Sequence, residues 1–517
     1  MSTTTENPET SQHPDLTRTP PPLGPTRRRR GLARVPGFGF LAPPVVEVAA
    51  TASHDDDAAD DVGEVLPFSP PGAKLRESQR AARSGWYAPT LAGAPSTTRQ
   101  AEILNLAIIA PPTGYDGIVN GRDTLSRALI ANDPFTEYNK PAHLREVSSP
   151  NVLTAGTVGT GKSSFTKTVF VIRPLVLRNR NVVVFDKKPD DAAPEQGEYA
   201  ELARRFGSEP IRFTQDGTGT RLNLLDPLVS AAEGGRYELL TAVARMARNG
   251  AALDDWERKA LRVALRRTIA AAEGVRVPTP ADLLPQLGRV ADEAEFADLH
   301  PRALDRLHEA GVSVRWTFDE LLESYPGLLD GETSSAVDLA HKLTVFDLSQ
   351  LSDNGQAVPV VMAIGNMWLM GRLRRARGEQ RAVTNVIYEE GWHLIGGPSA
   401  GLIKSNEKLS RALGISNVFV MHKGTDTPKD SPGYAVVQEA QTVHLFRQDR
   451  REDAEWAAET FNLAPESVDT LMNLPVGHCV MKVASRPEIQ LQHVRSRWET
   501  EVTNTDAALA IAARGGN

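Results

Sequence analysis

The residues with the most specific chemistry lie between Asn151 and Ser164. An apolar strand candidate, Asn151-Val-Leu-Thr-Ala155, runs into Gly156-Thr157-Val158-Gly159-Thr160-Gly161-Lys162-Ser163-Ser164. This stretch fits the P-loop pattern G-x-x-x-x-G-K-[ST], whose glycines let backbone N–H groups wrap a polyphosphate. We predict that Gly156 to Ser164 bind the phosphates of ATP. In this site Lys162 supplies positive charge and Ser163 a hydroxyl ligand for Mg²⁺.

A second group of residues supplies what hydrolysis requires beyond nucleotide binding. Val386-Ile-Tyr-Glu389-Glu390-Gly-Trp392 is an apolar strand that ends in two acids. Ligands of parallel sheets bind at the carboxyl ends of the strands, so both acids are expected beside the phosphates. We predict that Glu389 holds Mg²⁺ through water and that Glu390 orients and deprotonates the attacking water. The alternative is an exposed acidic strand end with no catalytic role.

Three further residues are candidates for contacts with the γ-phosphate. His422 ends the strand Val418-Phe-Val-Met-His422 and is a candidate sensor, the alternative being a structural histidine. Arg411 and Arg447 are predicted to lie near strand ends on the same side of the sheet. If subunits form a ring, either one could act as an arginine finger toward a neighbouring subunit. The alternative for each is a surface arginine with a local partner.

The elements that must position these residues alternate between strands and helices. Asn181-Val-Val-Val-Phe-Asp186 is a continuous apolar run, as expected for a parallel strand buried on both faces. Further strands are predicted at 209–214, 343–348, 383–388, 415–421 and 442–446, and helices at 165–177, 199–206 and 358–375. Residues 476–483 and 488–494 are predicted to form a terminal hairpin. The pattern indicates an α/β fold with a mostly parallel sheet and helices on both faces.

The sequence also predicts six segments. They are a disordered tail (1–85, including Arg27-Arg-Arg-Arg30), a small lead-in packed on the core (86–150), the first part of the core (151–228), an inserted all-helical domain (229–340), the second part of the core (341–497) and a C-terminal tail (498–517). Whether the arginine run contacts nucleic acid or lipid, or is simply solvated, stays open.

Composition limits the classes of protein that fit. The chain has 517 residues and a formal net charge of −7, which argues against a chain that coats nucleic acid everywhere but allows a local basic surface. Cys479 is the single cysteine, so no intramolecular disulfide forms, and its apolar surroundings predict a buried strand. No apolar run reaches membrane-spanning length and no signal peptide is recognisable. We therefore expect a cytoplasmic protein, with peripheral association at the cytoplasmic membrane as an option.

Several blocks in a fixed order resemble a known family. They are Asn151-Val-Leu before the P-loop, Val184-Phe-Asp186 followed by Gly197-Glu198-Tyr199, Leu222-Asn223-Leu-Leu-Asp226-Pro227, a helical segment, Val345-Phe-Asp-Leu348, and Glu389-Glu390-Gly-Trp392. From about residue 115 to 500 the chain resembles conjugative-transfer, type IV secretion ATPases of the VirB/TraC type, in the HerA–FtsK superfamily, in an actinobacterial version. The resemblance implies a RecA-like core, a homo-hexamer, and ATP hydrolysis at subunit interfaces. The implied partners are secretion or conjugation machinery at the inner membrane and DNA, with no small-molecule substrate other than ATP.

The sequence departs from the family pattern in three places. The usual Asp-Glu pair is Glu389-Glu390, which puts metal distance and turnover in question. The residues Lys187 to Gln196 are extra, and they predict a longer, mobile connection. At the sensor strand, Met421-His422 replaces a common Thr-Gln pair. Two other functions therefore stay open, a HerA-like or FtsK-like pump of double-stranded DNA and a non-catalytic ATP-binding scaffold.

Overall fold

The computed structural model describes residues 116–230, 235–292, 294–353, 355–376, 382–395, 400–401, 410–427, 429 and 431–503. All of them belong to one compact unit, Ala94–Asn517. The predicted tail 1–85, with its arginine run, lies outside the described residues, as do 86–115 of the lead-in and 504–517 of the C-terminal tail. The six predicted segment boundaries stay predictions.

The described residues form an eleven-stranded sheet with the order β2-β1-β11-β10-β9-β3-β8-β7-β4-β6-β5. From β9 to β5 all neighbours are parallel, whereas β10, β11, β1 and β2 join by antiparallel pairing. The strands are β1 (Val119–Asp123), β2 (Leu129–Ala131), β3 (Val152–Ala155), β4 (Arg180–Asp186), β5 (Ile211–Thr214), β6 (Leu343–Gln350), β7 (Val383–Tyr388), β8 (Ile415–Met421), β9 (Thr442–Leu445), β10 (His478–Val483) and β11 (Ile489–His493). The predicted mostly parallel sheet and the terminal hairpin, now β10 and β11, are confirmed.

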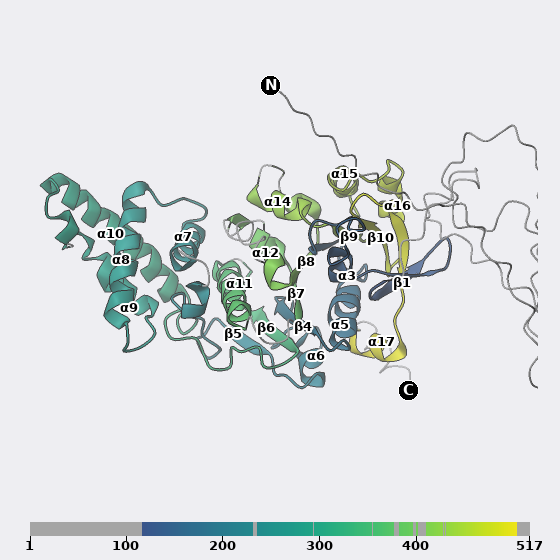
Figure 1. Cartoon of the computed structure of the whole chain (residues 1–517), viewed down its shortest axis with the longest axis horizontal. Coiled ribbons are helices and arrows are strands. Elements are labelled where there is room, and N and C mark those ends of the chain that lie inside the picture. The colour runs from purple at the N-terminus through teal and green to yellow at the C-terminus, as the bar shows by residue number, and fades with distance from the viewer. Residues whose placement is uncertain are drawn as a thin grey trace, which may run out of the picture. The chain divides into compact units, whose positions relative to one another are not determined.

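The helices near the sheet are α3 (Pro134–Tyr138), α4 (Lys162–Thr166), η3 (Lys167–Ile172), α5 (Arg173–Leu175), α6 (Ala200–Arg205), α11 (Ala357–Arg375), α12 (Trp392–Ile395), η7 (Gly424–Asp426), α14 (Pro432–Gln438), α15 (Arg451–Thr460), α16 (Ser467–Asn473) and α17 (Arg497–Thr503). Figure 1 shows α11 and α5 beside the strands that they cover. The helix after the P-loop runs through α4, η3 and α5 without a break. Its middle, η3, is a π-helix, a distortion that is frequent at functional sites.

The sheet is buried on both faces because its strands alternate between two apolar layers. In β4, Val183 and Phe185 belong to the layer with α11, and Val182 and Val184 to the layer with the P-loop helix. Aromatic rings stack across neighbouring strands, with centroids 5.1 Å apart for Phe185 and Tyr388. A Cβ on Gly365 of α11 would lie 2.6 Å from the Phe185 ring, so only glycine permits this approach.

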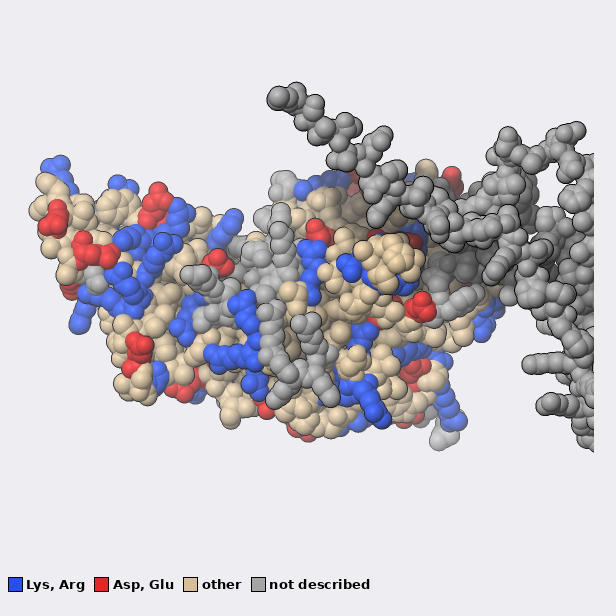
Figure 2. Space-filling model, in the orientation of Figure 1, with Lys and Arg blue, Asp and Glu red and all other residues tan. Residues whose placement is uncertain are grey.

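Between β5 and β6 the described residues form helices and no strand. These are η4 (Pro227–Ser230), α7 (Gly235–Ala247), α8 (Asp255–Ala272), α9 (Pro280–Leu287), η5 (Val290–Asp292), η6 (Ala294–Phe296) and α10 (Pro301–Ser324). Capping boxes begin α8 at Asp254 and α9 at Thr279. Figure 2 shows Lys and Arg side chains gathered over α8 to α10, and α8 exposes Arg258, Lys259, Arg262 and Arg266. Acids lie among these cations, because Arg258 pairs with Asp255 and both Lys259 and Arg266 pair with Glu295.

Two smaller predictions can be compared with the structure. Cys479 is buried in β10, as predicted, and burial raises the pKa of its thiol well above the usual range. Among the described residues, no helix has the length and apolar character that crossing a membrane requires.

Candidate nucleotide-binding and hydrolysis site

The P-loop connects the end of β3 to α4, at the centre of the parallel strands. Gly156, Gly159 and Gly161 have φ of +151°, +77° and +101°, values that favour glycine over residues with a Cβ. A Cβ on Gly156 would also lie 2.6 Å from the Cβ of Phe446. The loop is held in place because the N–H of Thr157 donates to the carbonyl of Arg447, at 2.9 Å.

The loop opens toward solvent in its middle and is anchored at its ends. Val158 and Gly159 are exposed, Thr160 is buried, and Ser163 and Ser164 are half-buried at the start of α4. No atom outside the neighbouring residues comes within 4 Å of a Cβ placed on Gly159. The N-terminal turn of α4 points its free N–H groups at this open space, which is the arrangement that binds phosphate in P-loops.

Lys162 is the cation of this loop and is 5% exposed. Its Nζ donates to the carbonyl oxygen of Thr157, at 2.8 Å. Burial lowers the pKa of its ammonium group to about 8, although the charges of Glu389 and Glu390 act in the opposite direction. Lys162 is therefore electrostatically coupled to both predicted catalytic acids.

Glu390 follows β7 and has a strained backbone. Its φ is +54°, in the left-handed region that few residues other than glycine adopt. The indole N–H of Trp392 donates to its Oε2 at 2.9 Å, and Nε2 of His422 lies 2.6 Å from its Oε1. Burial acts to raise the pKa of Glu390, but the hydrogen bond and charge of His422, the bond from Trp392 and the charge of Lys162 outweigh it and lower that pKa. Glu390 is thus a fixed and ionised carboxylate.

Glu389 has a very different environment from its neighbour. It is 3% exposed, and the hydroxyl of Tyr199 donates to its Oε1 at 2.5 Å. Burial raises the pKa of Glu389 to about 7, against the effect of this hydrogen bond. Its role as the metal-holding acid stays a prediction, and the structure shows that one of its oxygens already has a protein partner.

A buried ionic group surrounds Glu389. Lys167 of η3 is 1% exposed and pairs with Glu198 at 3.2 Å, and Lys188 pairs with the other oxygen of Glu198. Lys167 also lies 4.8 Å from the centre of the Tyr199 ring. In the sequence, Glu198 and Tyr199 belong only to the blocks that resemble the family and have no predicted role. They lie more than ten residues beyond β4, so no local pattern connects them with Glu389.

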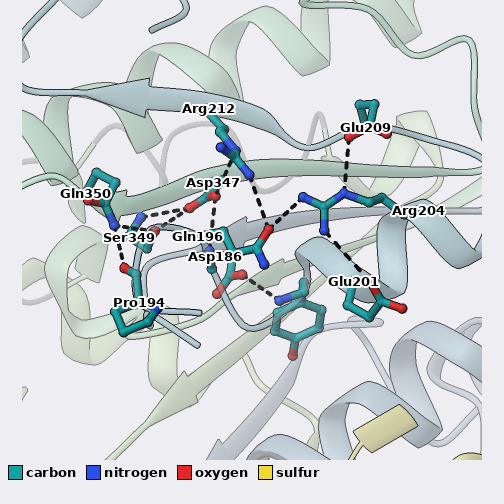
Figure 3. A network of polar contacts seen from close by, with 12 residues as sticks. Asp186, Pro194, Gln196, Glu201, Arg204, Glu209, Arg212, Asp347, Ser349 and Gln350 are labelled. Atoms are coloured by element: carbon teal, nitrogen blue, oxygen red, sulfur yellow. Dashed lines mark hydrogen bonds and ion pairs between the residues drawn. The ribbon is translucent and has the colours of Figure 1, made fainter. Parts of the chain in front are cut away.

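The extra residues Lys187 to Gln196 are tied to the sheet. The backbone pairs Pro189 with Gly197, and the N–H of Gly197 donates to Asp347 at 3.0 Å. Figure 3 shows Arg204 and Arg212 pointing at Gln196, which accepts from them at 2.6 and 3.2 Å. Hydrogen bonds therefore tie the end of this loop to neighbouring elements, and the expected mobility of the connection stays a prediction.

The two arginines lie at opposite edges of the sheet, so the prediction that they share one side is wrong. Arg447 follows β9 and is beside the P-loop, where its Nε lies 3.4 Å from Asp449. Arg411 precedes β8, at the amino ends of the strands, and donates to the carbonyl of Ser148 at 3.0 Å. Both arginines do lie near strands, as predicted. Arg411, however, precedes its strand, whereas Arg447 follows its own. The finger role of each stays a prediction.

His422 is close to the catalytic acid rather than isolated at its strand end. Strands β3, β8 and β7 are adjacent and parallel, which brings Ala155, Met421 and Tyr388 to one edge. The P-loop and His422 follow Ala155 and Met421 directly, and Glu390 comes two residues after Tyr388. The prediction that they share the carboxyl edge of the sheet agrees with this geometry, and the sensor role of His422 is not tested by it.

The residues of this site suit a phosphate ligand better than a metal ion whose ligands all come from the protein. Three glycines, the N-terminal turn of α4 and Lys162 form a cradle without a large side chain at its centre. Among the described residues, no group of three or more His, Cys, Asp or Glu could hold a metal ion. A Mg²⁺ ion here would depend on substrate phosphates and water for most of its ligands, which is the usual situation for Mg²⁺ in such sites.

Comparison with solved structures shows the same fold. VirB4 of Thermoanaerobacter pseudethanolicus superimposes with a TM-score of 0.60 at 19% identity, over 75% of this chain and 98% of that chain. At this identity the likeness shows the fold, and the predicted P-loop core with its mostly parallel sheet is confirmed.

Weaker likenesses involve the conjugative coupling protein TrwB. The unbound TrwBΔN70 form has a TM-score of 0.45 at 15% identity, over 75% of this chain and 95% of that chain. The complex of TrwB with a non-hydrolysable ATP analogue has a TM-score of 0.47 at 14% identity, over 67% and 86%. No protein-family model matches the chain, and no curated protein matches it either.

Proposed function

We propose that this chain is an ATP-hydrolysing motor that energises conjugative DNA transfer or type IV-like secretion. The observation that carries the proposal is the meeting of Lys162, Glu390 and His422 at the ends of three adjacent strands. The fold shared with VirB4 supports the same reading. Hydrolysis needs a phosphate cradle and an ionised group near the attacking water, and the P-loop and Glu390 are proposed for these roles, with His422 as the proposed sensor of the γ-phosphate.

In this proposal the residues from Gly156 to Ser164 bind the triphosphate. Lys162 releases the carbonyl of Thr157 and turns its charge to the phosphates, which offer a stronger partner than a neutral oxygen. Ser163, and Glu389 through water, are the residues that would hold Mg²⁺. The ion, when bound, neutralises charge on the phosphates and helps to align them.

Glu390 is the proposed general base. Its lowered pKa keeps it ionised near neutral pH, and Trp392 and His422 fix its direction. A base that is already oriented loses no entropy at the moment of reaction. His422 contacts Glu390 directly, so a change at His422 when the γ-phosphate leaves would be transmitted to the base in one step.

A homo-hexamer is part of the proposal because it gives the arginines a function. Arg447 lies beside its own P-loop, and Arg411 lies at the far edge of the sheet, where it has no route to the P-loop of its own chain. Either one is proposed to complete a neighbour's site. Mixing wild-type chains with Arg411→Ala or with Arg447→Ala chains tests this, because a finger supplied in trans lowers the activity of wild-type sites in proportion to the mixing ratio.

The motor is proposed to act in the cytoplasm, with DNA and the secretion or conjugation machinery at the inner membrane as partners. The test is phosphate release from Mg²⁺-ATP by the full chain, alone and with double-stranded or single-stranded DNA. Hydrolysis that requires Lys162 supports the ATPase. Strong stimulation by double-stranded DNA alone would favour a HerA-like or FtsK-like translocase, and tight ATP binding without turnover would favour a scaffold.

A further inference from the structure

A cavity lies at the amino ends of the parallel strands, at the edge of the sheet opposite the P-loop. Its volume is about 830 Å³, and it is lined by the first residues of β4, β6 and β7, the segment before β8 and the last turns of α11. We call it the amino-edge cavity. The site formed by Lys162, Glu390 and His422 does not include it, and of its lining residues only Arg411 has a part in the proposed function, as a candidate finger.

The ionisable side chains in the described lining of this cavity are either positively charged or uncharged. Arg372, Arg375 and Arg411 line it together with His341, and among the described residues that line it none is Asp or Glu. Arg372 and Arg375 are exposed. Clefts lined by one sign of charge concentrate ligands of the opposite sign.

Neutral polar residues line the cavity as well. Thr384 is one of them, although its hydroxyl is buried and is not itself open to the cavity. The amides of Asn139 and Asn181 line the same space, and the ring of Tyr138 forms part of the wall. Such a mixture of convergent polar groups and an aromatic surface is typical of sites for small molecules.

A simpler explanation covers only part of these observations. Arginines in the last turn of a helix interact favourably with its negative end, and α11 ends at Arg375. That explains the positions of Arg372 and Arg375, and a bond to the carbonyl of Ser148 holds Arg411. Neither contact explains why three arginines from two segments line one cavity.

We infer that the amino-edge cavity binds a phosphate-bearing small molecule of about nucleotide size. Three arginines present the forked donors that match phosphate oxygens. The volume lies within the range of about 300–1,000 Å³ that is usual for ligand and cofactor sites. The phosphate could belong to a nucleoside polyphosphate or to an inorganic polyphosphate, and titration with both distinguishes the two.

The test measures binding to the full chain in a Lys162→Ala background, which weakens the P-loop. Sodium tripolyphosphate and ATP are titrated by calorimetry into this protein and into versions carrying Arg372→Gln with Arg375→Gln. We expect the double substitution to raise the Kd for tripolyphosphate at least about tenfold, since each lost charge-assisted bond weakens binding. Arg374→Gln is the matched control, because it removes the same charge from the same turn of α11 but does not line the cavity. It should change Kd less than about twofold.

The two probes then identify the source. ATP binding at least about tenfold tighter than tripolyphosphate assigns a nucleotide, and equal binding assigns the phosphate groups alone. The inference is overturned if tripolyphosphate does not bind, if Arg374→Gln weakens binding as much as the double substitution, or if a single-stranded oligonucleotide displaces tripolyphosphate and binds more tightly. Should the double variant unfold by circular dichroism, Arg411→Gln alone must weaken tripolyphosphate binding at least about threefold for the inference to stand.

Discussion

The carboxyl and amino edges of the parallel sheet, where its strands end and begin, differ in whether their charged side chains are paired. At the carboxyl edge, Glu390 is bonded to His422 and Trp392, and Glu198 is paired with two lysines. At the amino edge, Arg372 and Arg375 line an open cavity whose described lining residues include no acid. The contrast indicates that the carboxyl edge is organised in advance for a reaction, whereas the amino edge is organised to receive an anion.

The difference follows from what each edge must do. A catalytic group has to be oriented before the substrate arrives, so its partners come from the protein itself. A binding site for a mobile anion must leave its cations unpaired, because a protein carboxylate would compete with the ligand. Substitutions at the carboxyl edge should therefore change rate and pH dependence, and those of Arg372 and Arg375 at the amino edge should change only binding.

The largest effect is expected for Lys162→Ala. This change removes the cation of the phosphate cradle, and we expect kcat/KM for ATP to fall by at least about a hundredfold. Because the pKa of Lys162 is about 8 in the free protein, kcat/KM of the wild type should also decline as the pH rises past that value. Steady-state phosphate release measures both the loss of kcat/KM in the variant and the pH dependence of the wild type. Lys259→Ala, on the exposed surface of α8, is the control, and an equal loss in it would contradict the assignment.

A smaller effect is expected for His422→Ala. His422 helps to lower the pKa of Glu390, so its removal should raise that pKa. The acid limb of the kcat/KM profile should move to higher pH, and the rate near neutral pH should fall about three- to tenfold. A profile with an unchanged acid limb would show that His422 does not tune the base.

The smallest effect is expected for Glu389→Gln, and it concerns stability. Burial raises the pKa of Glu389 from 4.5 to about 7, so the folded chain keeps a proton that the unfolded chain releases as the pH rises between these values. The wild type thus loses on the order of 3 kcal/mol over this window. Glutamine stays neutral and can accept the bond from Tyr199, so the variant should have a Tm a few degrees higher near pH 8.

Thermal unfolding of the wild type and of Glu389→Gln, near pH 8 and near pH 4.5, measures this difference in stability. Little difference is expected at the lower pH, since Glu389 is protonated in the folded chain and about half protonated in the unfolded chain there. A variant that is less stable at both pH values would show that Glu389 is held as a buried anion. Loss of ATPase activity in the same variant would support its role toward Mg²⁺.

The sequence predicted the carboxyl edge well because that edge follows from short-range patterns. A P-loop and a strand that ends in acids specify their own local geometry, and parallel pairing brings their ends together. The environment of Glu389 could not be predicted, since Tyr199 is far away in the sequence and reaches it only through the fold. The same holds for the loop from Lys187 to Gln196, whose partners Arg212 and Asp347 come from other strands.

The amino edge was not recognised at all. Arg411 was identified by its position near a strand, but nothing in the sequence indicates which end of β8 it would occupy or that α11 would end beside it. The cavity is formed by segments that are separated by long stretches of sequence. No local pattern describes such a site, so only the three-dimensional arrangement shows it.

The most direct test compares phosphate release from Mg²⁺-ATP by the wild type with that by Glu390→Gln, which keeps the size of the side chain and removes its basicity. Binding of a labelled ATP is measured on the same samples. We predict that the variant binds ATP within about threefold of the wild type and hydrolyses it at least about a hundredfold more slowly. Equal hydrolysis by the two proteins would contradict the assignment of Glu390 as the base and, with it, the proposed motor site.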